Sequence, residues 1–235
     1  MPPEIAVIDA SVGDTPAEDN LTRELDGTTT VYKASEGERP PAPTGSVGYD
    51  GVVVSGSQTS VYEDRQWIHD LTAWIRAVHR ADVPVLGICW GHQFLVQSLG
   101  GRVVDMGEHE LGYRTVHRRG EDPLFTDVPR SFTAFQTHSD RVAELPSGAV
   151  ELARNDYGVQ AFRLGSSYGV QFHPEYDRDT AEWVIGNKDL AEDRLAAVRG
   201  TITDETVAAA EEATRVFDNF LAVVADHQRR PERPF

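Results

Sequence analysis

A short apolar strand that runs into a helix through a glycine-flanked cysteine constrains this chain more than any other feature. Residues 84–93 read PVLGICWGHQ, in which Val85 to Ile88 suit a buried strand. Trp90 to Leu99 are predicted to form a helix that ends at the following pair of glycines. Cys89, the one cysteine of the chain, therefore lies at a strand-to-helix corner.

The glycines around this corner predict a reactive cysteine. Gly87 and Gly91 give the pattern G-x-C-x-G, which is the cysteine form of a nucleophile elbow. Small neighbours permit the strained turn, and the positive end of the following helix favours the thiolate, which is the nucleophilic form. A lone cysteine is more often a small buried apolar residue. The glycine spacing, the strand and the helix are three independent requirements of an elbow, so we predict that Cys89 is a nucleophile.

The elements on either side of the elbow predict an α/β fold with an open, mixed but mainly parallel sheet and flanking helices. The expected elements are strands at 4–10, 28–32 and 50–57, a loop at 11–20 and a helix over 67–78. The residues Ser60 to Glu63 match a capping box and are expected to begin that helix. After Gly101 the chain changes to short strand-like runs, and from about Arg178 it becomes helical. We therefore predict a strand-rich second half and a helical C-terminal extension.

The charge of the chain limits its partners. It has 38 acidic and 22 basic residues, a net charge of −16, and Lys33 and Lys188 are its only lysines. Such a surface repels nucleic acid and anionic lipid. With no leader-like start and no apolar run of about 18 residues, a cytoplasmic protein without membrane association is expected. Acidic excess with few lysines resembles proteins of salt-loving organisms, and an ordinary acidic protein is the alternative.

A nucleophilic cysteine needs a base, and His173 is the best placed of the eight histidines. The residues Tyr168 to Phe172 are predicted to form a strand that ends at His173, and Pro174 stiffens the turn that follows. Glu175 lies two residues further on, where its carboxylate can accept the other ring N–H. An arbitrary His-Pro-Glu is usually a surface turn. Beside a cysteine elbow, a catalytic pair is favoured.

These motifs resemble those of the class I, triad-type glutamine amidotransferases. The resemblance rests on residues 87–93 (GICWGHQ) and 171–175 (QFHPE), and on 137–142 (THSDRV), which is similar to the GMP synthetase type and its free-standing homologues. It covers roughly residues 4–175. The resemblance implies that Cys89 is the nucleophile, His173 the acid and base, and Glu175 the orienting carboxylate.

The resemblance also implies how substrate is held. In the family, the oxyanion is stabilised by the backbone N–H after the nucleophile, here Trp90, and by one from a Gly-Gly-Pro turn. That turn aligns with Gly56, Ser57 and Gln58, so serine replaces the second glycine and glutamine replaces the proline. A backbone donor survives this change. The residues implied to hold the amino-acid end of glutamine are Gln93 and the backbone of Ser139 and Asp140.

The implied activity is hydrolysis of the glutamine side-chain amide to glutamate and ammonia through a cysteine thioester, with no metal or cofactor. The sequence has no ATP pyrophosphatase loop, so the ammonia would pass to a separate synthetase subunit. The alternative is a free-standing γ-glutamyl hydrolase or peptidase that uses the same triad on another γ-glutamyl small molecule. A non-catalytic binding protein is the third and least favoured. Residues 1–177 are predicted to form the amidotransferase domain, and 178–235 a helical extension packed on it.

Overall fold

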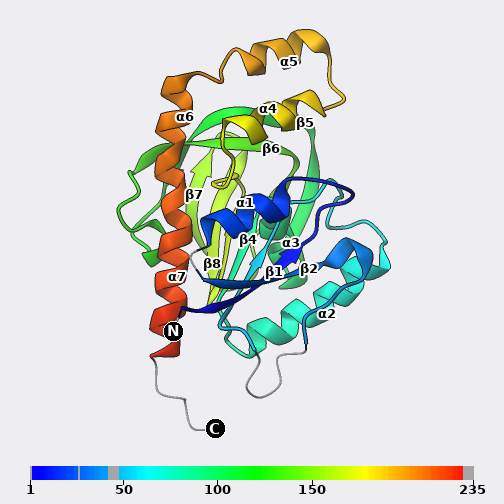
Figure 1. The fold of residues 1–235 in the computed structure, drawn as a ribbon, viewed down its shortest axis with the longest axis vertical. Helices are drawn as coiled ribbons and strands as arrows, with labels where there is room; N and C mark the ends of the chain where they lie inside the picture. Colours follow the sequence, from blue (N-terminus) through cyan, green and yellow to red (C-terminus); the bar gives the residue numbers. More distant parts are fainter. Residues whose placement is uncertain (1, 26, 42–47, 230–235) are drawn as a thin grey trace.

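The computed structural model describes residues 2–25, 27–41 and 48–229 (Figure 1). The strands are β1 (Glu4–Asp9), β2 (Thr28–Lys33), β3 (Gly51–Val54), β4 (Val85–Ile88), β5 (Arg102–Arg118), β6 (Ser131–Glu144), β7 (Val150–Asn155), β8 (Gly158–Leu164) and β9 (Ser167–Val170). The helices are α1 (Ala17–Glu24), α2 (Gln66–Arg80), α3 (Trp90–Ser98), α4 (Arg178–Gly186), α5 (Glu192–Arg199), α6 (Asp204–Ala210) and α7 (Arg215–Gln228). Short 3-10 turns are η1 (Ala34–Glu36), η2 (Pro123–Phe125) and η3 (Glu211–Thr214).

The strands of the described residues form one mixed sheet. Its order is β2-β1-β3-β4-β9-β8-β7-β5-β6. The strands from β2 to β9 are parallel, and β4 lies inside this parallel part between β3 and β9. From β9 to β6 each neighbouring pair is antiparallel. The parallel core with flanking helices confirms the predicted α/β class, and the elbow strand lies near the middle of the sheet.

Successive side chains of the parallel strands point to opposite faces of the sheet, and both faces are apolar. On β1, Ile5 and Val7 belong to one buried cluster, while Ala6 and Ile8 belong to the other. The first cluster includes residues of α1 and α7, and the second includes residues of α2 and α3. Helices therefore cover both faces, which is why the central parallel strands β3 and β4 are apolar and buried along their whole length.

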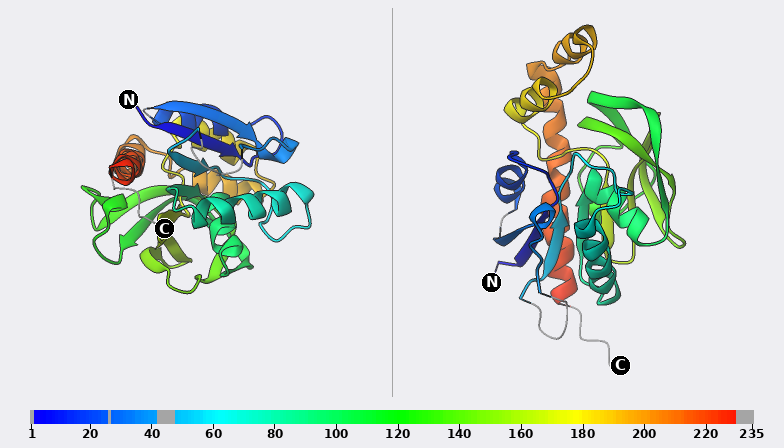
Figure 2. Two further views of the ribbon diagram at one scale, coloured as in Figure 1. Left: turned by 90° about the horizontal axis from the view of Figure 1, so that it is seen from below. Right: turned by 90° about the vertical axis from the view of Figure 1, so that its right-hand side faces the viewer.

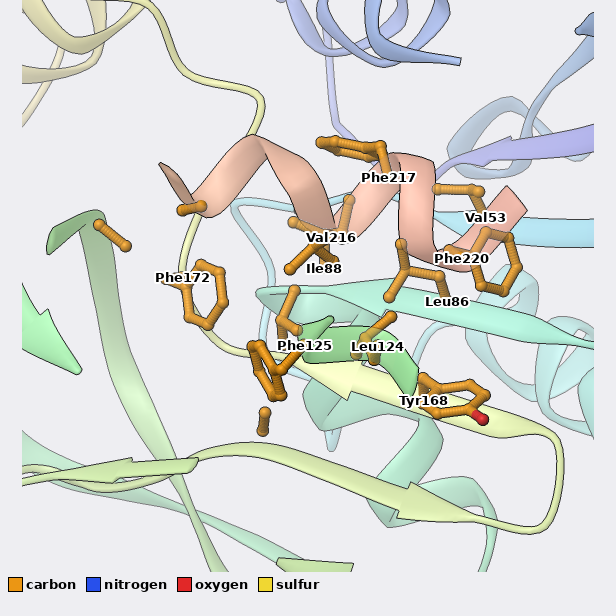
Figure 3. Close-up of a cluster of buried hydrophobic side chains, with 14 of the residues drawn as sticks. Val53, Leu86, Ile88, Leu124, Phe125, Tyr168, Phe172, Val216, Phe217 and Phe220 are labelled. Atoms are coloured by element: carbon orange, nitrogen blue, oxygen red, sulfur yellow. The ribbon is translucent and has the colours of Figure 1, made fainter. Parts of the chain in front are cut away.

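The last helix belongs to the core of the sheet. Figure 3 shows Phe217 and Phe220 of α7 over Leu86 and Ile88 of β4, the strand that carries the elbow. Each phenylalanine is at most 1% exposed, and burial of such a side chain contributes about 1.5–3 kcal/mol. In Figures 1 and 2, α7 is the long helix that lies along the sheet.

The helices between the last strand and α7 pack on the β5–β6 hairpin. A third buried cluster joins Val184 of α4 and Leu195 of α5 to Leu111 of β5 and Phe135 of β6. The figures place α4 and α5 at the end of the molecule where this hairpin lies (Figures 1 and 2). None of the helices in the described part of the chain has the length and apolarity needed to cross a membrane.

Two local predictions were wrong. The expected loop at 11–20 contains the start of α1, a helix whose composition is mostly polar because it buries only a narrow side through Leu21. The expected capping box does not begin α2. Glu63 accepts a hydrogen bond from the Ser60 N–H at 2.7 Å and closes a turn, and the helix starts three residues later at Gln66. A capping-box sequence can form a local turn without beginning a helix, and here the helix begins only after the turn.

Candidate active site

The elbow has the strained backbone that its sequence predicts. Cys89 adopts φ +52° and ψ −103° between β4 and α3, a conformation that is costly for a residue with a side chain. A Cβ on Gly87 would overlap the carbonyl oxygen of Gly91, and a Cβ on Gly91 would overlap that of Val54. The two glycines are therefore required by close backbone packing that holds Cys89 at the corner.

The structure places the histidine and the glutamate side by side. His173 forms a single β-bridge with Phe135, through its N–H and the carbonyl oxygen at 2.9 Å. Its Nδ1 lies 2.7 Å from Oε1 of Glu175, and both side chains are buried. The carbonyl oxygen of Glu175 accepts a hydrogen bond from Arg23 at 2.7 Å, which fixes the turn. With Nδ1 occupied, Nε2 is the ring nitrogen left without a hydrogen bond to the described residues.

The electrostatics of the site favour a charged His173. Burial by itself lowers the pKa of this ring, but the negative charges of Glu175 and Cys89, together with the hydrogen bond to Glu175, raise the pKa to about 10. The ring of Tyr176 stacks on His173 with centroids 4.0 Å apart. Burial, and then the same two negative charges, raise the pKa of the Tyr176 phenol well above its usual range, so it stays neutral. The arrangement therefore favours the imidazolium form of His173 beside Cys89.

His92, which is close to the nucleophile in sequence, has different surroundings from His173. His92 lies three residues after Cys89, is fully buried and packs edge-on against Phe162 at a centroid distance of 5.2 Å. Burial lowers the pKa of His92 to about 3, so this ring is neutral. A neutral histidine in the core fits a packing role, and it leaves His173 as the base candidate next to the cysteine.

A cavity of about 260 Å³ lies over the elbow. This volume is near the lower end of the ~300–1,000 Å³ typical of small-molecule sites. All nine site residues expected from the sequence line it: Gly56, Ser57, Cys89, Trp90, Gln93, Ser139, Asp140, His173 and Glu175. A Cβ on Gly56 would lie 3.0 Å from Cε1 of His173 and 3.8 Å from Cβ of Cys89, so this glycine lies directly against the cysteine and histidine.

The side chain of Gln93 supports the cavity wall. Its amide nitrogen donates to the carbonyl oxygen of Asp140 and to Oε1 of Gln171, both at 2.9 Å. Nδ1 of His138 also contacts the Asp140 carbonyl oxygen at 2.8 Å, and its Nε2 lies 2.8 Å from the buried carboxylate of Glu110. Gln93 and His138 therefore fix the backbone beside Ser139 and Asp140. The side-chain N–H groups of Gln93 are therefore already hydrogen-bonded within the protein.

Sequence reasoning missed a second group of cavity residues. They are His109 on β5, Thr137 and His138 on β6, and Tyr176, Trp183, Val184, Asn187 and Lys188 around α4. Trp183 and Val184 lie on α4, whereas Asn187 and Lys188 follow its end at Gly186, so in sequence the four residues resemble an ordinary helix end. The scarcity of lysine was the one available signal, because Lys188 is one of only two in the chain.

The α/β fold is shared with solved glutamine amidotransferases. A glutamine amidotransferase from Thermotoga maritima superposes with a TM-score of 0.79 at 22% identity, over 94% of this chain and 99% of that chain. A glutamine amidotransferase from Methylobacillus flagellatus gives a TM-score of 0.77 at 21% identity, over 95% of this chain and 96% of that chain. At these identities the likeness concerns the fold.

The sequence comparisons identify the family. The family model "Glutamine amidotransferase class-I" matches residues 7–189, so the chain belongs to this family. GMP synthase [glutamine-hydrolyzing] of Vibrio vulnificus is 30% identical over 181 residues, which are 67% of this chain and 33% of that protein. The enzyme of the same name from Aquifex aeolicus is 31% identical over 198 residues, or 76% and 37%. The match therefore spans about a third of the length of these relatives.

Proposed function

We propose that this protein hydrolyses the side-chain amide of glutamine to glutamate and ammonia through a thioester on Cys89. The observation that carries the proposal is the meeting of three groups in one small cavity. They are the strained elbow cysteine, the unpaired Nε2 of His173, and the Glu175 carboxylate 2.7 Å from Nδ1, all among the described residues. Nucleophile, base and orienting group are the parts that acyl transfer through cysteine needs.

The proposed steps follow from these positions. The Cys89 thiolate attacks the side-chain carbonyl carbon of glutamine, and the carbonyl oxygen becomes an oxyanion. His173 gives its proton to the amide nitrogen, the carbon–nitrogen bond breaks, and ammonia leaves while the glutamyl group stays on sulfur. His173 then takes a proton from water, and the hydroxide attacks the thioester to release glutamate and restore the thiolate. Glu175 stabilises the charged ring in the resting state and between steps.

Backbone N–H groups of Ser57 and Trp90 are the proposed oxyanion donors. Trp90 is the first residue of α3, where a backbone N–H has no partner within the helix. Ser57 stands where the family has glycine, and its hydroxyl lies 3.1 Å from the hydroxyl of Thr59. We propose that this hydroxyl pair supports the turn in place of the family's proline. One oxyanion donor is worth about 3 kcal/mol, so the turn must keep its N–H aimed at the cavity.

We further propose that the ammonia passes to a separate synthetase subunit, because the relatives named GMP synthase are about three times as long as the matched segment. Free-standing glutaminase activity would waste glutamine, so it should be low alone and rise with the partner. Ammonia release from glutamine, measured with and without candidate synthetases from the same cells, tests this. Activity that no synthetase changes would contradict the assignment of a partner.

One observation favours the alternative of a γ-glutamyl hydrolase. The chain's own segment around α4 lines the cavity with Trp183 and Lys188, so no second protein is needed to complete those walls. In both proposals residues 1–177 form the catalytic domain and 178–235 the helical extension. A panel of γ-glutamyl amides separates the two. Fast cleavage of one of them without a partner, with glutamine a poor substrate, would establish the hydrolase and reject the amidotransferase.

A further inference from the structure

Lys188 places a cation in the wall of the catalytic cavity. It lies two residues after the end of α4 and is half-buried. Within residues 2–25, 27–41 and 48–229 its side chain makes no hydrogen bond or ion pair, and its backbone N–H donates to the carbonyl oxygen of Ile185. The other lysine shows the contrast, since Nζ of Lys33 lies 2.7 Å from Asp9 and 2.8 Å from the hydroxyl of Ser11. A lysine unpaired among the described residues is unexpected in a chain with 38 acidic residues.

The surroundings of Lys188 locate it relative to the nucleophile. Burial lowers the pKa of its ammonium group, and the negative charge of Cys89 opposes that effect, so the two groups are within electrostatic reach. Lys188 and His109 of β5 both line the cavity. In agreement with that, burial and then the charge of Lys188 lower the pKa of the His109 ring. His109 precedes Glu110, which pairs in register with His138, the residue before Ser139. Lys188 therefore lies on the β5–β6 side of the cavity, towards Ser139.

A half-buried ammonium group has lost part of its hydration, and no carboxylate in the described part of the chain pairs with Lys188 to compensate for that loss. A ligand anion held at the same place would compensate for it through a charge-assisted hydrogen bond. In a γ-glutamyl compound the amide carbon is bound at Cys89, and the α-carboxylate lies a few bonds away from it. The family resemblance implies that the amino-acid end of the substrate lies at Ser139 and Asp140, which line the same cavity. The charge and the place of Lys188 both fit that carboxylate.

We infer that Lys188 binds the α-carboxylate of the γ-glutamyl substrate and so selects compounds in which this carboxylate is free. The inference rests on the proposed function. The segment after α4 is then part of the substrate site, and the ammonium group of Lys188 recognises the substrate carboxylate. An amidotransferase and a γ-glutamyl hydrolase would both use it, because both act on the same glutamyl group.

Binding without turnover tests the inference. The Cys89→Ala protein is titrated by calorimetry with L-glutamine and with L-glutamine α-amide, in which the α-carboxylate is a neutral carboxamide. Adding Lys188→Met should weaken L-glutamine binding by about tenfold or more and leave binding of the α-amide unchanged, since a charged hydrogen bond contributes ~1.5–3 kcal/mol. Lys188→Arg should retain most of the affinity. Arg80→Met, which removes an exposed charge outside the cavity, should change neither ligand.

The outcomes separate the inference from the function. Equal weakening of both ligands by Lys188→Met, or no weakening of L-glutamine, would overturn the role of Lys188 while leaving the proposed function in place. If the Cys89→Ala protein with Lys188 intact binds neither L-glutamine nor L-glutamate, the proposed function and the inference both fail. Thermal unfolding of each variant shows whether the fold is intact, and a Lys188→Met protein that is folded is required for the comparison with Lys188→Arg.

Discussion

Replacing Glu175 with glutamine should move the alkaline limit of activity to lower pH. The structure raises the pKa of His173 from 6.5 to about 10, which corresponds to about 5 kcal/mol in favour of the charged ring at ~1.4 kcal/mol per pH unit. Burial lowers this pKa, and the charge of Glu175 is the largest of the effects that raise it. Removal of that charge should therefore lower the pKa of His173. Because this pKa is raised, the charge of His173 stabilises the fold fully below pH 6.5, and that stabilisation is lost as the pH rises through about 10.

The assay is the rate of ammonia release at limiting glutamine between about pH 6 and about pH 11, which reports the groups of the free enzyme. With Glu175 present, activity should persist to about pH 9 and fall as His173 loses its proton. The Glu175→Gln protein should lose activity at a lower pH than the parent, and the alkaline decline of its unfolding free energy should be smaller. Glu144→Gln, an exposed change at the end of β6, is the control and should shift neither. An unchanged alkaline limb in Glu175→Gln would refute the coupling of Glu175 to His173.

Four further outcomes follow from the same structure. Cys89→Ser should abolish hydrolysis while the melting temperature stays close to that of the parent, because serine is far less acidic; near-normal turnover would eliminate the mechanism. Gly91→Ala should destabilise the protein by about 1–3 kcal/mol in urea unfolding, since its Cβ meets backbone, whereas Gly186→Ala, with open space around it, should not. Phe220→Ala should cost about 3–5 kcal/mol, and a loss below 1 kcal/mol would show that α7 is not part of the core. We propose that the acidic surface is an adaptation to salt, so melting temperature should rise from about 0.1 M to about 1 M salt as the screening length falls from ~10 to ~3 Å; a flat response would count against it.

The sequence predicts the parts of the site that are formed by residues close together in the chain. The strained turn at Cys89 needs Gly87 and Gly91 at fixed spacing, and the His173–Glu175 pair is two residues apart. The spacing of each motif is local, although Gly91 is also required by its close approach to Val54 of β3. The parallel strands were predictable for the same reason, because a strand buried on both faces is a continuous apolar run.

The parts that could not be predicted depend on long-range packing. Nothing adjacent in sequence to Lys188 indicates a cavity, because its place depends on α4 lying across the β5–β6 hairpin. The same holds for His138, whose partner Glu110 comes from a different strand and is 28 residues away. The helix α1 was missed because one buried leucine in a polar stretch gives too weak a periodic signal.

The most direct test of the account is to observe the acyl-enzyme. The protein is mixed with glutamine, quenched in acid within the turnover time, and measured by intact-mass and peptide mass spectrometry. A mass increase of one glutamyl group on the peptide that contains Cys89, absent from the Cys89→Ser protein, is the predicted result. Ammonia release by a protein that carries no such group under any quench time, or a glutamyl group on a different residue, would contradict the thioester mechanism.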